Sequence, residues 1–438
     1  MSFNARHAVA VPGTTARPRF APVSRARLPT NTTANRHAIH RWFNFIAGFA
    51  PEFVAHHCPE NPGGLLLDPF AGCGTSLVVA QFYGHKAVGF EPHPFFLRIA
   101  RAKTAAPPTE HRLRKLEAAL LNGLYSPQPI DSLSDAAAAF LRKLFETQTL
   151  TQLLGSRASL HDAGLDNDDL AFLLLSRVVE MCSRSQTDGI YKAPSSRKKA
   201  ATPIEAIRNV IDEVRSDTAQ ASSSNGAPRA VVHSDSALDM SSVKSGSVDV
   251  AITSPPYLNN FDFAEMTRME LYFWGICDSW RDITATVRSK LVVNTTTALM
   301  GHRDSQAQHR AAVPTALLNR LDSIVRALAK ERRVRAGKKE YDLLVYPYFS
   351  QMTQVLRETL RCLRTDAELH VVVADAAFYG IHVATPQLLA DAMSEVGFRA
   401  VVCKKLRDRG HRWILDKRDG SPIGLGEYHI SAKRGGTN

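Results

Sequence analysis

Short apolar runs alternate with helical patterns along most of this chain. The runs are rich in leucine or β-branched residues and are bounded by Gly, Ser, Pro or Asp, which is typical of strands buried in a sheet. Helical patterns separate most of them, and this alternation predicts an α/β fold with a parallel, doubly wound sheet. The predicted strands cover residues 65–67, 86–90, 230–235, 248–252, 369–375, 400–403 and 427–432.

The strand at 248–252 is followed by Ser254-Pro255-Pro256-Tyr257. The two prolines end the strand and make residues 253–257 a rigid extended loop. In open α/β sheets, ligands bind at the carboxyl ends of the strands. The Ser254 hydroxyl and the Pro255 carbonyl are acceptors, and the Tyr257 ring offers a stacking surface. These groups suit a flat, amine-bearing ring such as a nucleobase, whereas an ordinary Pro-Pro turn is the alternative unless a cofactor site exists elsewhere.

Such a cofactor site is predicted after the first strand. Gly72 and Gly74 open a tight turn into a helix, where the backbone can approach a ligand closely. The second strand ends at Glu91, about 20 residues after Gly72, which is the spacing expected for an acid that binds both ribose hydroxyls. The sequence G-x-G-x-x-G is absent, so a mononucleoside cofactor is favoured over a dinucleotide.

Two long segments interrupt the strand pattern. Residues 105–228 show helical spacing without strand signals and predict a helical insertion, a candidate for target recognition. Residues 281–340 predict a second, basic insertion without strands, and either segment or both are candidates for reading the target sequence. Contact with nucleic-acid phosphates is one interpretation of their cations, and an ordinary solvated face is the other. The candidate phosphate ligands are Lys192, Arg197, Lys198, Lys199, Arg332, Arg333 and Arg335.

The remaining segments complete the predicted organisation. Residues 1–35 contain no acidic residue and predict a flexible basic arm. Residues 36–104 would form a cofactor-binding half that begins with an aromatic segment broken at Pro51. Residues 229–280 would form a catalytic half, and residues 341–438 the last part of the sheet, with a helix at 352–363.

Composition narrows the partners of the protein. The 438 residues carry a net charge of +12 with a pI near 9.5, which favours nucleic acid or an anionic membrane surface as partner. No apolar segment is long enough to span a bilayer, and the N-terminus lacks the apolar core of a secretory signal. Six cysteines without C-x-x-C spacing suggest neither a zinc site nor a disulfide framework. We therefore expect a cytoplasmic protein without a metal.

The pair of motifs at residues 68–75 and 254–257 resembles those of the S-adenosylmethionine-dependent DNA methyltransferases that modify exocyclic amines. These enzymes make N4-methylcytosine or N6-methyladenine. The resemblance covers about residues 37–103 and 230–435. It implies a seven-stranded class I methyltransferase (Rossmann-like) sheet, S-adenosyl-L-methionine as cofactor and DNA as partner, with a cognate restriction endonuclease as a further candidate.

The resemblance also implies roles for individual residues. The catalytic loop would be Ser254, Pro255, Pro256 and Tyr257. Glu91 would bind the ribose of the cofactor. A segment around Phe49 and Pro51 would match a further cofactor-contacting motif. The remaining cofactor-binding residues would be Asp68, Phe70, Ala71, Gly72, Gly74 and Thr75 near the methionine part and Asp235 near the adenine.

The loop chemistry suits methylation of a poorly nucleophilic amine. Acceptors at Ser254 Oγ and the Pro255 carbonyl would favour a pyramidal nitrogen whose lone pair faces the methyl donor. The base would be flipped out of the duplex and stacked on Tyr257. In this family Ser at the first loop position favours cytosine N4, and adenine N6 is the alternative. An RNA base-amine methyltransferase and a non-catalytic nucleic-acid-binding protein remain competing interpretations.

Overall fold

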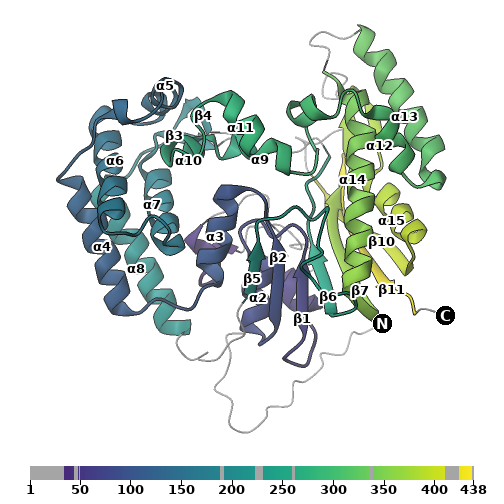
Figure 1. Ribbon diagram of the computed structural model, residues 1–438, viewed down its shortest axis with the longest axis horizontal. Helices are drawn as coiled ribbons and strands as arrows, with labels where there is room; N and C mark the ends of the chain where they lie inside the picture. The colour runs from purple at the N-terminus through teal and green to yellow at the C-terminus, as the bar shows by residue number, and fades with distance from the viewer. Residues whose placement is uncertain are drawn as a thin grey trace.

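The computed structural model describes residues 34–43, 48, 50–187, 192–221, 230–258, 262–334, 339–409 and 424–436. Its centre is a seven-stranded sheet in the order β10-β11-β7-β6-β1-β2-β5 (Figure 1). The seven predicted strands are therefore confirmed. Their bounds are Leu65–Asp68 (β1), Lys86–Phe90 (β2), Ala230–His233 (β5), Val248–Thr253 (β6), Leu363–Ala374 (β7), Phe398–Asp408 (β10) and Gly426–Arg434 (β11).

One strand departs from the predicted parallel arrangement. β11 pairs antiparallel with both β7 and β10, whereas the pairs β7–β6, β6–β1, β1–β2 and β2–β5 are parallel. The alternation of strands and helices could not show this, because strand periodicity carries no direction. The sheet has β1 near its centre and one antiparallel strand, β11, next to one edge. This is the predicted class I methyltransferase sheet.

Alternate side chains along the strands face two separate cores. Leu66, Val250 and Ile252 lie on one face with helices α1 (Pro51–His57) and α2 (Thr75–Phe82). Leu67 and Ala251 lie on the opposite face with the helices α13 (Thr315–Val334), α14 (Tyr341–Cys362) and α15 (Thr385–Val396). Strands covered on both faces need apolar residues at nearly every position, which explains their continuous apolar runs.

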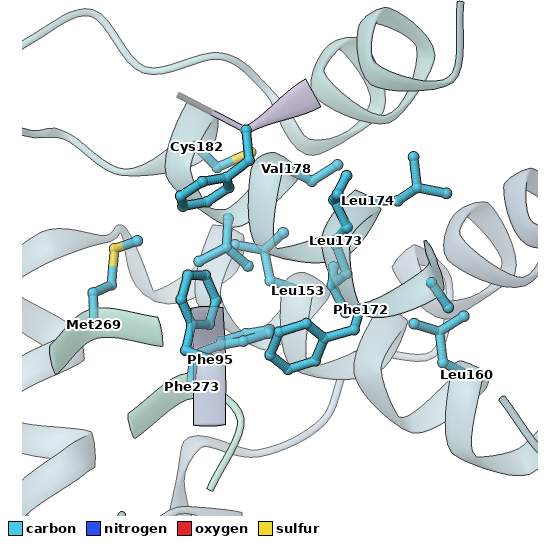
Figure 2. Close-up of a cluster of buried hydrophobic side chains, with 14 of the residues drawn as sticks. Phe95, Leu153, Leu160, Phe172, Leu173, Leu174, Val178, Cys182, Met269 and Phe273 are labelled. Carbon is cyan, nitrogen blue, oxygen red and sulfur yellow. The ribbon is translucent and has the colours of Figure 1, made fainter. Parts of the chain in front are cut away.

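The predicted helical insertion forms a lobe beside β5, at the left of Figure 1. Its leucines share one core with Phe95 and Phe172, and Figure 2 shows these rings packed together. The prediction that this region lacks strands was wrong, because Ser185–Thr187 (β3) and Lys192–Arg197 (β4) form a small antiparallel hairpin. The helices of the insertion are Glu110–Leu124 (α4), Asp135–Leu144 (α5), Thr147–Asp162 (α6), Asp169–Cys182 (α7) and Pro203–Ala221 (α8), and the preceding helix Pro94–Thr104 (α3) packs against α7.

The predicted insertion at 281–340 is helical where it is described. It leads into α14, which begins before the predicted start at 352 and contains Pro347. Residues 364–368 are part of β7. The remaining helices are Phe263–Met266 (α9), Arg268–Phe273 (α10), Trp280–Thr286 (α11) and Gln306–Ala312 (α12), and a β8–β9 hairpin covers Ala376–Phe378 and Ile381–Val383.

None of the helices in the described ranges is long and apolar enough to cross a membrane. The predicted basic arm lies almost entirely outside the described residues, which begin at Ala34.

Candidate active site

A pocket opens at the carboxyl ends of β1, β2, β5 and β6. It encloses about 740 Å³, part of it open to solvent. Residues from both predicted motifs line it, together with Glu91. Because parallel strands end at the same edge of the sheet, turns far apart in the sequence meet there. The pocket-lining residues from the predicted site are Phe70, Gly72, Glu91, Ser254, Pro255, Pro256 and Tyr257.

The glycine turn brings the backbone to the pocket wall. Gly72 lines the pocket with φ of 52°, a left-handed conformation that glycine adopts without strain. Gly74 also has a left-handed backbone, with φ of 82°, but a Cβ added there would meet Ala100 of α3 at 3.3 Å. Gly72 therefore lies at the pocket, whereas Gly74 lets α2 pack closely against α3. Ala71 is buried beneath the turn, and Thr75 begins α2.

Asp68 fastens the glycine turn to the neighbouring strand. Its carboxylate accepts hydrogen bonds from Thr253 Oγ1 at 2.6 Å and the Phe70 backbone N–H at 3.0 Å, and also from Ser76 Oγ. Burial raises its pKa to about 6, against the lowering effect of these hydrogen bonds. Asp68 is 1% exposed and is not a pocket-lining residue. This geometry gives it a structural task next to the predicted cofactor site.

Asp68→Ala is expected to lower the free energy of unfolding by about 2–4 kcal/mol, because it leaves three buried donors without their acceptor. Urea denaturation followed by circular dichroism measures this loss. Asp68→Asn is the matched control, since its carbonyl keeps an acceptor for part of the cluster and should cost less. Equal stability of wild type and Asp68→Ala would contradict the structural task.

Glu91 presents a buried carboxyl group to the pocket. It is 7% exposed, and its Oε1 accepts a hydrogen bond from the His93 backbone N–H at 2.8 Å. Burial raises its pKa to about 8, although the backbone N–H groups of His93 and Gly72 oppose this shift. Such a group can accept hydrogen bonds from ligand hydroxyls once it loses its proton, as a ribose-binding acid must.

Several pocket residues were not predicted from the sequence. The imidazole of His93 lies in the wall, where its Nδ1 accepts from the Phe95 backbone N–H and its Nε2 lies 2.9 Å from Thr267 Oγ1. Burial lowers its pKa to about 3, so the ring is neutral. The unpredicted residues of the pocket come from four separate segments of the chain, so no single sequence motif contains them. The unpredicted lining residues include Phe90, Phe96, Ser236, Phe263, Leu291 and Val292.

Hydrogen bonds to α14 and to β11 hold the loop after β6. Tyr348 of α14 donates a hydrogen bond to the Pro256 carbonyl at 3.1 Å. Tyr257 OH donates to Glu427 Oε1 of β11 at 3.0 Å, and Ser254 Oγ donates to Tyr257 OH at 3.5 Å. Burial and the nearby Glu427 carboxylate raise the pKa of Tyr257 well above its usual value, so the phenol keeps its proton.

Glu427 is itself anchored, although no sequence motif points to it. It is 6% exposed, and Arg407 of β10 donates from Nε to its Oε2 at 2.7 Å. The guanidinium of Arg409 lies 5.5 Å from the centre of the Tyr257 ring. β11 thus supplies a carboxylate near the loop, and β10 and the residue that follows it supply two cations. An acid at the start of the last predicted strand was the only available signal.

Ala71, Gly74 and Thr75, like Asp68, are not pocket-lining residues, and three further predicted cofactor-contacting residues lie away from the lining or outside the described residues. Asp235 is exposed just after β5, and its neighbour Ser236 lines the pocket instead. Pro51 is buried at the start of α1. Phe49 lies outside the described residues. These assignments stay predictions.

The predicted phosphate ligands fall into different settings. Arg332 lies within 3.2 Å of Asp342 and 3.9 Å of Glu340, so protein carboxylates already surround it. Lys198 donates to the Glu180 carbonyl at 2.9 Å. Lys199 and Arg333 are exposed. Lys192 and Arg197 belong to β4, with side chains that are not described, and Arg335 lies outside the described residues.

The strand order and the position of the pocket define a class I methyltransferase fold. No family model matches the chain. It is 22% identical to the type II methyltransferase M.BsoBI of Geobacillus stearothermophilus over 419 residues, which span 85% of this chain and 81% of the relative. It is 23% identical to the type II methyltransferase M.AvaI of a Nostoc species over 406 residues, or 82% and 79% of the two chains. These relatives confirm the predicted resemblance.

Solved structures show a weaker likeness. A geranyl diphosphate methyltransferase complexed with GPP and sinefungin has a TM-score of 0.29 and 11% identity, with 88% of this chain and 77% of that chain covered. The rRNA methyltransferase AviRa of Streptomyces viridochromogenes has a TM-score of 0.28 and 11% identity, with 87% and 81% covered. These structures add nothing to the fold assignment, which rests on the strand order.

Proposed function

We propose that this protein is a DNA methyltransferase that transfers a methyl group from S-adenosylmethionine to the exocyclic amine of a flipped base, with cytosine N4 favoured. The observation that carries the proposal is the shared pocket: Ser254 and Tyr257 line the same space as Gly72 and Glu91. Similarity to type II methyltransferases over most of the chain supports it.

The pocket suits the proposed cofactor chemically. Glu91 offers a buried carboxyl group where a ribose diol would need an acceptor, and Gly72 removes a side chain where backbone would approach the ligand. Phe90 and Phe96 add apolar wall. S-adenosylmethionine, when bound, supplies an electrophilic methyl group on a sulfonium. The protein would position the amine and stabilise the charge that develops on it.

Hydrogen-bond direction in the loop favours Ser254 as an acceptor. Its hydroxyl proton points to Tyr257, whose own proton points to Glu427. The lone pairs of Ser254 Oγ then remain for an N–H of the target amine. Glu427 is therefore proposed as a positioning residue, which acts on the base through Tyr257 and Ser254.

Glu427→Ala is expected to lower kcat about tenfold while the affinity for S-adenosylmethionine stays unchanged, because a hydrogen bond to a charged group contributes about 1.5 kcal/mol. Steady-state kinetics and calorimetric titration separate the two quantities. Tyr257→Phe removes the same hydrogen bond by deleting its donor, the phenol hydroxyl. The double variant should therefore lose little more than either single variant, and fully additive losses would count against the chain of hydrogen bonds.

The function is tested with purified protein, labelled S-adenosylmethionine and either mixed-sequence DNA or total RNA. Digestion to nucleosides and mass spectrometry identify the product. N4-methylcytosine in DNA is the expected result. N6-methyladenine would retain the mechanism and overturn the inference from Ser254. A methylated amine in RNA alone would assign the protein to the competing RNA class, and lack of any product with both substrates would favour a non-catalytic nucleic-acid-binding protein.

A further inference from the structure

Three histidines from separate segments meet on one face of the sheet. His370 is on β7, His429 is on the neighbouring β11, and His57 is the last residue of α1, which covers this face. The ring centre of His57 lies 4.1 Å from that of His370 and 4.9 Å from that of His429. One nitrogen from each ring lies within 4.8 Å of the other two. We call these residues the histidine cluster.

From this geometry we propose that the histidine cluster binds a divalent transition metal of the zinc type, separate from the pocket at the strand ends. Zinc–imidazole bonds of about 2.1 Å in tetrahedral geometry place ligand nitrogens about 3.4 Å apart. His370 Nδ1 and His429 Nε2 form a hydrogen bond of 3.1 Å, and binding of the ion between them would move its proton to the other nitrogen of the donor ring. A small inward shift of His57 would complete a three-nitrogen site.

The surroundings hold the rings in a form suited to metal binding. His57 Nδ1 donates its proton to the Phe53 carbonyl at 2.8 Å, which leaves the lone pair on Nε2. A backbone carbonyl commonly fixes the tautomer of a metal-binding histidine in this way. His370 is 5% exposed, and burial disfavours the charged imidazolium. Neutral imidazole is the form that binds metals.

A fourth ligand position is available beside the cluster. A water molecule can take this position and complete four-coordination, whereas the half-exposed Glu368 carboxylate lies 3.2 Å from His370 Nε2, the ring nitrogen that faces away from the ion. Nitrogen with oxygen ligands selects zinc, cobalt, nickel or copper over magnesium or calcium. The sequence-based expectation of no metal rested on cysteine spacing, which says nothing of histidines from three distant segments.

A metal here would join the N-terminal helix to the C-terminal strands. α1 begins at Pro51, near the segment predicted to contact the cofactor. β11 carries Glu427 two residues before His429, and Glu427 holds Tyr257. The ion would thus link α1 to the strand that carries Glu427 without touching the reacting groups, which is a structural task.

The test uses the full-length protein stripped with a chelator, dialysed against Zn²⁺ or Co²⁺ and freed of unbound ion. Inductively coupled plasma mass spectrometry should find one zinc per chain. Bound Co²⁺ should show the visible absorption of a tetrahedral site, and Zn²⁺ should raise the thermal midpoint of the stripped protein. Substoichiometric zinc with no shift of that midpoint would overturn the proposal.

Variants locate the ion. His57→Gln and His429→Gln should each abolish the Co²⁺ absorption and the zinc-dependent shift of the thermal midpoint. His56→Gln is the matched control, since His56 is the exposed neighbour of His57 on the same helix and lies outside the cluster. Retention of stoichiometric metal by both cluster variants would overturn the assignment. Circular dichroism establishes that each variant is folded, and the response of the unmodified protein to zinc tests the proposal independently of any variant.

Discussion

Tyr257→Ala is expected to lower kcat about 10- to 100-fold while the dissociation constant of S-adenosylmethionine changes little. Stacking of a base on an aromatic ring contributes about 1–3 kcal/mol, and the substitution removes that surface. It also removes the acceptor that orients the Ser254 hydroxyl. Single-turnover kinetics on a DNA substrate and calorimetric titration with the cofactor measure the two effects.

Tyr257→Phe provides the control for this prediction. Phenylalanine keeps the stacking face and loses only the hydroxyl that bonds Glu427. The loss of kcat in Tyr257→Phe should therefore match that in Glu427→Ala and be smaller than that in Tyr257→Ala. Equal loss of turnover and cofactor affinity in Tyr257→Ala would show that the ring supports the pocket as a whole, and would reject its proposed contact with the base.

The parts of the site that sequence could predict are those carried by local motifs. A proline pair can only end a strand, so Ser254 to Tyr257 had to form a loop at its carboxyl end. The glycines at 72 and 74 similarly require a turn, and both have positive φ. Spacing alone placed Glu91 after β2, and the pocket contains it. These features need no knowledge of distant contacts.

The parts that sequence could not predict depend on pairing between distant strands. Glu427 reaches Tyr257 because β11 inserts antiparallel between β7 and β10, and the periodicity of a strand does not reveal its neighbour. The same insertion brings His429 beside His370. Asp68 stands inside a recognisable motif that does not reveal its hydrogen bond to Thr253 of β6, and its contact with the cofactor stays a prediction.

Glu91 leads to the second large prediction, which concerns pH. Because burial raises the pKa of this carboxyl to about 8, the ligand-free protein holds a proton there at neutral pH. Acceptance of hydrogen bonds from both ribose hydroxyls needs the carboxylate, so binding must release that proton. The affinity for S-adenosylmethionine should then rise about tenfold per pH unit as pH increases toward 8, and level off above it.

Calorimetric titrations between pH 6 and pH 9.5 in buffers of different ionisation enthalpy would measure both the affinity and the released proton. Glu91→Ala should weaken binding about 100-fold at pH 9, since two hydrogen bonds to a charged acceptor are lost. Glu91→Gln keeps one acceptor and cannot titrate, so its weaker affinity should not depend on pH over this range.

A pH slope that persists in Glu91→Gln would assign the titration to another group. An affinity of the wild type that is flat with pH would mean that the proton stays on Glu91 in the complex, and that the carboxyl group donates to the ribose instead of accepting from both hydroxyls.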